Sequence, residues 1–167
     1  SQREEIGCIG AKLYYPDNRI QHSGVIIGLY GCAGHSHKYY NSNSNGYFYR
    51  LVSVQNMSAV TAACLMIKTK IYKELNGLDE INLEVAFNDV DFCLRAQEKG
   101  YRNIFTPYCE AYHYESISRG KENTPIKMDR FKREVEYIKK RYSIIFKRGD
   151  PFYNPNLTLI RENFSLK

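Results

Sequence analysis

The stretch Phe87-Asn88-Asp89-Val90-Asp91-Phe92-Cys93-Leu94-Arg95 decides how the rest of the chain is interpreted. Asn88 is a favourable N-cap residue, and Asp91 three positions later is spaced to complete a capping box. Gly100 is the stop signal expected just after a helix. The pattern predicts a capped helix beginning at Asn88. Asp89 and Asp91 then lie in its first turn, where acidic side chains favour the positive end of the helix dipole.

The composition indicates one globular domain in a reducing compartment. The chain has 167 residues, of which 43% are hydrophobic, enough for one sizeable core. No apolar run approaches the roughly 20 residues of a membrane span, and the polar start at residues 1–5 lacks a signal-peptide pattern. The 5 cysteines form no CxxC pair, which predicts free thiols, several of them buried.

The chain is basic, with a net charge of +6 and a pI near 9.0. Much of the excess lies between Lys127 and Arg148. Such a balance suits nucleic acid, anionic lipid or phosphate-bearing substrates. The alternative is a solvated helix face, whose charge Glu134 and Glu136 partly balance. A face toward an anionic membrane or a lipid-phosphate acceptor is favoured over nucleic acid.

Strand and helix patterns alternate along the chain, which predicts an α/β fold with a mixed sheet and flanking helices. Strands are expected at 6–15, 19–28, 59–67, 101–105 and 111–114. Helices are expected at 49–58, 69–75, 88–99 and 125–142. A turn is expected at 16–18 and irregular structure at 150–156. The polar, glycine-rich segment 31–46 is expected to be a mobile loop, because long loops in compact domains are usually functional or flexible.

Eight stretches of the sequence match one known family, and they occur in the same order as in that family over nearly the whole chain. They are 7–17, 20–25, 33–38, 60–64, 77–80, 87–95, 100–102 and 150–156. In these stretches the chain resembles the C-terminal half of family-2 glycosyltransferases with the GT-A fold. The resemblance is to the bacterial members that build rhamnan, O-antigen and other cell-surface polysaccharides.

The resemblance implies a partial GT-A domain of the nucleotide-diphospho-sugar transferase type. Residues 1–167 would form its acceptor side, and the nucleotide-binding half with the Asp-x-Asp metal motif would precede Ser1. The whole enzyme would transfer a sugar, with inversion, from a nucleotide-sugar donor to a hydroxyl of a saccharide or lipid-linked acceptor. It would act in the cytoplasm or at the inner face of the membrane. Alone, the chain is expected to be inactive and to self-associate through apolar surface left uncovered near residues 6–13.

The resemblance also assigns roles to residues of the candidate site. Asp89 matches the general base that takes the acceptor proton, and Asn88 stands where many relatives carry Glu. Asp91 would be structural or would face the acceptor. His35 and His37 would face the acceptor from their loop.

A divalent metal, Mg²⁺ or Mn²⁺, would neutralise the leaving diphosphate and would be bound mainly by the N-terminal half. By position, His113 fits a metal ligand, and a hydrogen-bonded strand histidine is the alternative. Arg119 would contact the diphosphate, unless it is a solvated loop arginine.

Two other classes of function compete with this interpretation. His22, His35 and His37 could form a metal hydrolase centre, but no acidic partner lies near them in sequence. The basic segment could make the chain a nucleic-acid or anionic-surface module without catalysis. Salt-sensitive DNA binding would favour that module, whereas nucleotide-sugar dependence would favour the transferase.

Overall fold

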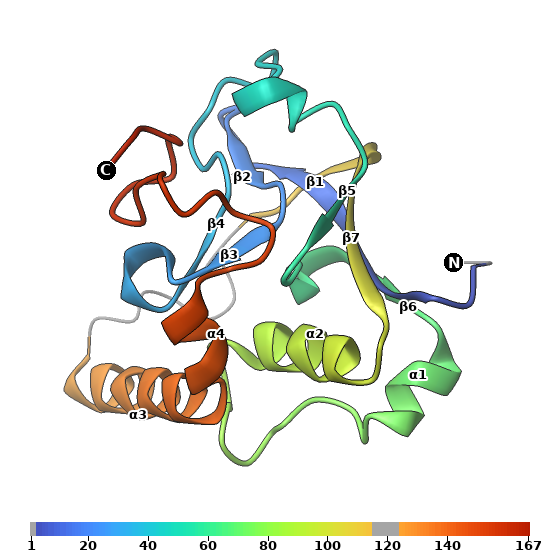
Figure 1. Ribbon diagram of the computed structural model, residues 1–167, viewed down its shortest axis with the longest axis vertical. Coiled ribbons are helices and arrows are strands. Elements are labelled where there is room, and N and C mark those ends of the chain that lie inside the picture. Colours follow the sequence, from blue (N-terminus) through green and yellow to red (C-terminus); the bar gives the residue numbers. More distant parts are fainter. Residues whose placement is uncertain (1–2, 115–123) are drawn as a thin grey trace.

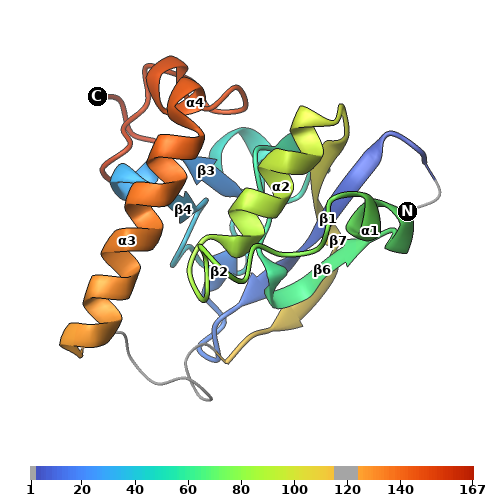
Figure 2. The same ribbon diagram turned by 90° about the horizontal axis from the view of Figure 1, so that it is seen from below.

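The computed structural model describes residues 3–114 and 124–167. A curled sheet forms one layer, and three helices form the other (Figures 1 and 2): α2 (Asn88–Glu98), α3 (Pro125–Arg141) and α4 (Ser143–Arg148). The short helix α1 (Thr69–Glu74) lies at the edge of the sheet. The predicted α/β class, with a mixed sheet and flanking helices, is confirmed. This architecture is compatible with part of a nucleotide-sugar transferase-like domain.

The central strand of the main sheet is β1 (Ile6–Tyr14). Its neighbours are β2 (Ile20–His22) and β6 (Leu65–Ile67), both antiparallel, and β7 (Arg102–Tyr112), which is parallel. β5 (Gln55–Met57) pairs antiparallel with β7. Because β1 has partners along both edges and its Ile6, Cys8 and Leu13 are buried, the expected uncovered surface at 6–13 is wrong.

The predicted strand 19–28 divides into two at Ser23 and Gly24. Gly24 has a φ of 102°, and an added Cβ there would lie 2.3 Å from Cε of Met57. The chain therefore turns, and β3 (Val25–Ile27) leaves the main sheet to pair with β4 (Ala33–His35). Between them runs the 3₁₀ turn η1 (Leu29–Gly31). The segment 31–46, predicted to be a loop, therefore contains strand β4, and its mobility stays a prediction.

The segment from 47 to 67 also departs from prediction. A 3₁₀ turn, η2 (Tyr47–Tyr49), and strand β5 replace the predicted helix at 49–58. The predicted strand 59–67 is interrupted by η3 (Ala62–Cys64), whose N-cap hydroxyl at Thr61 accepts a hydrogen bond from Ala63 N. Side chains from distant segments bind the backbone here, so short-range patterns could not reveal the interruption.

The two strands predicted at 101–105 and 111–114 are one strand, β7. Its pairing with β1 shifts register between Thr106, opposite Ala11, and Glu110, opposite Lys12. Pro107 lies inside this irregularity, where its missing N–H is tolerated. The predicted helices at 69–75 and 125–142 are confirmed as α1 and α3.

Helix α2 exists as predicted, but it begins differently. Phe87, with φ 62°, occupies the N-cap position and offers no side-chain cap, so Asn88 is the first helical residue. The Asp91 carboxylate turns into the core instead of toward Asn88, so the N-cap and capping-box predictions are wrong. The stop at Gly100 is confirmed, because Gly100 has a φ of 88° and its N–H bonds Gln97 O.

The loop that connects α1 and α2 is fixed at both ends. Arg95 donates to the carbonyls of Leu75 and Gly77 at its start. At its end, the buried Glu134 carboxylate accepts hydrogen bonds from Val85 N at 3.0 Å and Ala86 N at 3.1 Å. The two ends of the loop are therefore held by one side chain from α2 and one from α3.

The core lies between the sheet and the helices, where Val90, Phe92, Cys93 and Leu94 of α2 are buried. The prediction of free thiols is confirmed, since all 5 cysteines are unpaired and Cys8, Cys32 and Cys93 are buried. In the described part of the chain, no helix has the length and apolar character needed to cross a membrane.

Candidate functional site

Asp89 lies in the first turn of α2 and is half-buried. One carboxylate oxygen, Oδ2, accepts a hydrogen bond from Ala62 N at 3.0 Å, and Oδ1 accepts one from Val90 N at 2.8 Å. The carboxylate is therefore held by backbone donors from η3 and α2 while part of it stays accessible. A fixed, accessible carboxylate is suited to accept a proton.

His22 of β2 is fully buried beside η3. Its Nε2 accepts hydrogen bonds from Gly24 N at 3.2 Å and Thr61 N at 3.4 Å. Nε2 is thus the acceptor nitrogen, so Nδ1 carries the hydrogen, and among the described residues this Nδ1 has no hydrogen-bond partner. Burial, and secondarily the neighbouring His35, hold the pKa of His22 well below its usual value, so the ring is neutral.

His35, at the end of β4, packs against His22. The two rings meet edge to face with centroids 4.8 Å apart. The Nδ1 atom of His35 lies 2.8 Å from the carbonyl oxygen of Gln21, which places the half-buried His35 beside β2.

Gln21 also binds His113, which follows the end of β7. The Gln21 amide nitrogen donates to the His113 carbonyl at 3.1 Å, which fixes the orientation of the amide. Its Oε1 then lies 2.8 Å from Nδ1 of His113, so this ring nitrogen is the donor. The lone pair of His113 therefore sits on Nε2, which has no hydrogen-bond partner within residues 3–114 and 124–167.

These contacts join residues that are far apart in sequence. From Asp89 they pass through the backbone of Thr61 and Ala62 to His22, then to His35, Gln21 and His113. We call Asp89, His22, His35, Gln21 and His113 the candidate site. Gln21 received no role from the sequence, because a lone glutamine in a strand carries no recognisable signal.

His113 has the geometry that a metal ligand needs. An oxygen partner on Nδ1 orients the ring and leaves Nε2 available, as is usual for metal-bound histidines. Within the described residues, however, no three His, Cys, Asp or Glu side chains converge on one point. His113 therefore fits as a single ligand of a metal whose other ligands would come from elsewhere.

His37 does not join the candidate site. It is buried, and its Nδ1 lies 2.6 Å from Ser36 Oγ and 3.2 Å from Ser23 Oγ. Its Nε2 accepts a hydrogen bond from Tyr47 N at 3.1 Å. Burial, with a smaller effect of Arg50, lowers its pKa from 6.5 to about 3. In this structure His37 is a neutral ring that holds its segment against η2.

Asp91 takes the structural of its two expected roles. It is fully buried, and its carboxylate lies 2.7 Å from Arg95 Nε, 2.6 Å from the Tyr142 hydroxyl and 3.2 Å from Arg141 Nε. Asn88 is half-buried beside Asp89. Arg119, expected at the diphosphate, lies outside the described residues.

Comparison with known proteins shows that the chain is similar in sequence to segments of two longer proteins. It is 55% identical over 166 residues to the uncharacterized protein y4gI of Sinorhizobium fredii (strain NBRC 101917 / NGR234), covering 99% of this chain and 18% of the relative. It is 32% identical over 182 residues to the O-antigen biosynthesis protein RfbC of Myxococcus xanthus, covering 100% of this chain and 13% of that protein. The chain thus spans less than a fifth of the length of either relative.

The chain matches no profile of a known protein family. No solved structure matches it either. The comparison therefore relates the chain to one segment of a protein named for O-antigen biosynthesis.

Proposed function

We propose that the chain is the acceptor side of an inverting glycosyltransferase that acts in cell-surface polysaccharide synthesis. The donor would be a nucleotide-sugar, and the acceptor a hydroxyl of a saccharide or of a lipid-linked glycan. Support comes from the similarity to an O-antigen biosynthesis protein, from the resemblance of the 87–95 stretch to family-2 glycosyltransferases, and from a compatible α/β fold.

The observation that carries the proposal is the geometry of Asp89. A sugar hydroxyl attacks an anomeric carbon efficiently only when a base removes its proton during the attack. Ala62 N and Val90 N hold the Asp89 carboxylate in place, so it needs no reorganisation to serve as that base. The acceptor oxygen would bond to the anomeric carbon as the bond to the diphosphate breaks, and the hydroxyl proton would pass to Asp89.

His113 would hold a divalent metal, Mg²⁺ or Mn²⁺, through Nε2. When bound, this metal supplies positive charge that stabilises the departing diphosphate. The role of Gln21 is to keep the His113 ring in the tautomer that has its lone pair on Nε2. The nucleotide-binding residues and further metal ligands would come from a separate half of the domain. The enzyme would work in the cytoplasm or at the inner face of the membrane.

The test is the substitution Asp89→Asn in the complete gene product, assayed for nucleotide-sugar turnover. Removal of a general base should lower turnover about 10²- to 10⁴-fold while donor binding is retained. Asp129→Asn, on the exposed side of α3, is the matched control and should leave turnover unchanged. A folded Asp89→Asn protein with near-normal turnover would rule out Asp89 as the base.

A further inference from the structure

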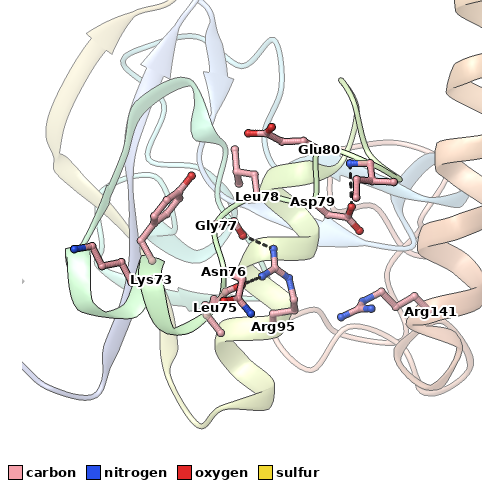
Figure 3. Close-up of a pocket in the computed structure, with 11 residues that line it drawn as sticks. Lys73, Leu75, Asn76, Gly77, Leu78, Asp79, Glu80, Arg95 and Arg141 are labelled. Atoms are coloured by element: carbon pink, nitrogen blue, oxygen red, sulfur yellow. Dashed lines mark hydrogen bonds between the residues drawn. The ribbon is translucent and has the colours of Figure 1, made fainter.

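A cavity lies beside Arg95 of α2. It has a volume of about 790 Å³ and is bordered by the end of α1, the loop that follows it, Arg95 of α2 and Arg141 at the end of α3. Figure 3 shows the Arg141 guanidinium pointing toward that of Arg95. The candidate site uses none of these side chains.

At one end of this cavity, two arginines share one carboxylate. Arg95 and Arg141 share a single buried carboxylate, that of Asp91, so the three groups together have a net charge of +1. Lys73 also borders the cavity, but so do the carboxylates of Asp79 and Glu80, so the positive charge that lacks a partner is confined to the arginine end. Because Arg95 and Arg141 have one carboxylate between them, this end of the cavity attracts an anion.

The two arginines differ in how far their donors are used. The Arg95 guanidinium donates hydrogen bonds to Asp91 and to the carbonyls of Leu75 and Gly77. Arg141 uses only Nε, which lies 3.0 Å from the Tyr142 hydroxyl and 3.2 Å from Asp91. Its two terminal nitrogens bond to none of the described residues. This planar pair of donors matches a carboxylate or phosphate group.

The rest of the wall offers groups that suit sugar hydroxyls. The Glu80 carboxylate and the Asn76 amide line the cavity without a hydrogen-bond partner among the described side chains. Asp79, in contrast, is already engaged by Asn82 and Tyr137. The Tyr72 ring is stacked on Phe92 and is 39% exposed, so it presents a fixed apolar surface. Glu80 would repel a bare oxyanion but accept hydrogen bonds from hydroxyl groups.

We propose that this cavity binds an anionic saccharide, with its carboxylate or phosphate on the terminal nitrogens of Arg141 and its hydroxyls on Glu80 and Asn76. We call it the Arg141 pocket. The inference does not depend on Asp89 acting as a base, because it concerns binding alone.

Binding of small probes to the 167-residue protein, followed by NMR titration or calorimetry, tests the ligand class. D-glucuronate and glucose 1-phosphate should bind at least about 10-fold more tightly than neutral glucose, since one good charged contact is worth about a factor of 10. Equal binding of glucose would overturn the role of the charge. Inorganic phosphate that binds as tightly as glucose 1-phosphate would overturn the role of the sugar.

Substitutions then locate the site. Arg141→Gln should weaken glucuronate binding about 10-fold or more, whereas Lys140→Gln, which removes the same charge from the adjacent exposed position, should change it less than about 2-fold. Equal effects of the two would mean that only general charge matters, and would refute the pocket.

Because Arg141→Gln also removes a contact to Asp91, a second variant is needed that leaves that contact intact. Glu80→Ala touches only the exposed wall and should weaken glucuronate binding about 3-fold or more. Unchanged or tighter binding by folded Glu80→Ala would show that Glu80 does not contact a saccharide.

Discussion

The hydroxyl of Tyr142 donates a hydrogen bond of 2.6 Å to Oδ1 of Asp91, and so ties the end of α3 to the first turn of α2. Burial, together with this bond to Asp91, raises the pKa of Tyr142, so the phenol remains a donor over the whole ordinary pH range. With Arg95 and Arg141, it satisfies a carboxylate that has no access to water. Packing between the two helices therefore depends on one ionised group.

Asp91→Asn should lower the free energy of unfolding by about 3–5 kcal/mol, because it removes the carboxylate that both arginines neutralise. Urea denaturation followed by circular dichroism measures the loss. Asp129→Asn, whose carboxylate is 68% exposed, should change stability by less than about 0.5 kcal/mol. A loss below about 1 kcal/mol for Asp91→Asn would show that the buried charge is dispensable.

Acid should destabilise the fold through His37. Its pKa is about 3 in the folded protein against 6.5 as the ordinary value, so between these limits the unfolded chain binds the extra proton. Stability is therefore fully present above about pH 6.5 and falls as the pH decreases toward 3, by up to about 1.4 kcal/mol per pH unit for one proton. His22 acts in the same direction.

Urea midpoints between pH 7.5 and pH 4.5 measure this dependence. His37→Gln can still accept the hydrogen bond from Tyr47 N. This variant should reduce the slope of unfolding free energy against pH by the contribution of one proton. An unchanged slope in that variant would assign the acid sensitivity to other groups.

Gly10→Ala should destabilise the protein by about 1–3 kcal/mol, because the added Cβ would lie 2.5 Å from Cβ of the buried Val60. Gly7→Ala on the same strand is the comparison, since its nearest neighbour, Cβ of Tyr101, is 3.0 Å away. Thermal unfolding should rank Gly10→Ala as the more damaging of the two. The reverse order would mean that the strand relaxes away from Val60 at little cost.

Thiol titration should separate the cysteines by burial. Cys109 is exposed and should react first with a disulfide reagent, whereas Cys8, Cys32 and Cys93 are buried. Burial also raises the pKa of Cys32 to about 11, which further depletes the reactive thiolate. All 5 thiols should react in denaturant, and Cys109→Ser should abolish the fast phase. Rapid reaction of Cys93 without denaturant would contradict the packing of α2.

The parts of the fold that were predictable have local causes. The spacing of Met128, Phe131, Val135 and Ile138 was enough to predict α3, and Gly100 was enough to predict where α2 ends. The break in 59–67 was not predictable, because the backbone there is bound by His22 and Asp89, which are distant in sequence. The cap of α2 was missed because Phe87 adopts a left-handed conformation that its residue type does not favour.

The candidate site also contains residues that could be predicted from the sequence and one that could not. Asp89, His35 and His113 were predicted from resemblance, and one network connects them in the structure. The role of Gln21 could not be predicted, since it depends on His113, which is distant in sequence. The separation of Asp91 from Asp89 follows from helix geometry, because residues two apart lie on different faces of a helix. The catalytic role of Asp89 and the metal role of His113 remain predictions for the experiments above.

The loop between α1 and α2 is held at its start by Arg95 and at its end by Glu134, and this limits where the chain can change in length. Residues added beside Leu75, Gly77 or Val85 would pull a backbone group away from the side chain that binds it. Between these ends, the Asp79 carboxylate accepts hydrogen bonds from Ile81 N, Asn82 N and the Tyr137 hydroxyl, so the middle of the loop is held as well. Homologues should therefore keep the length of this loop, and an engineered insertion or a fused tag at any point within it should lower stability.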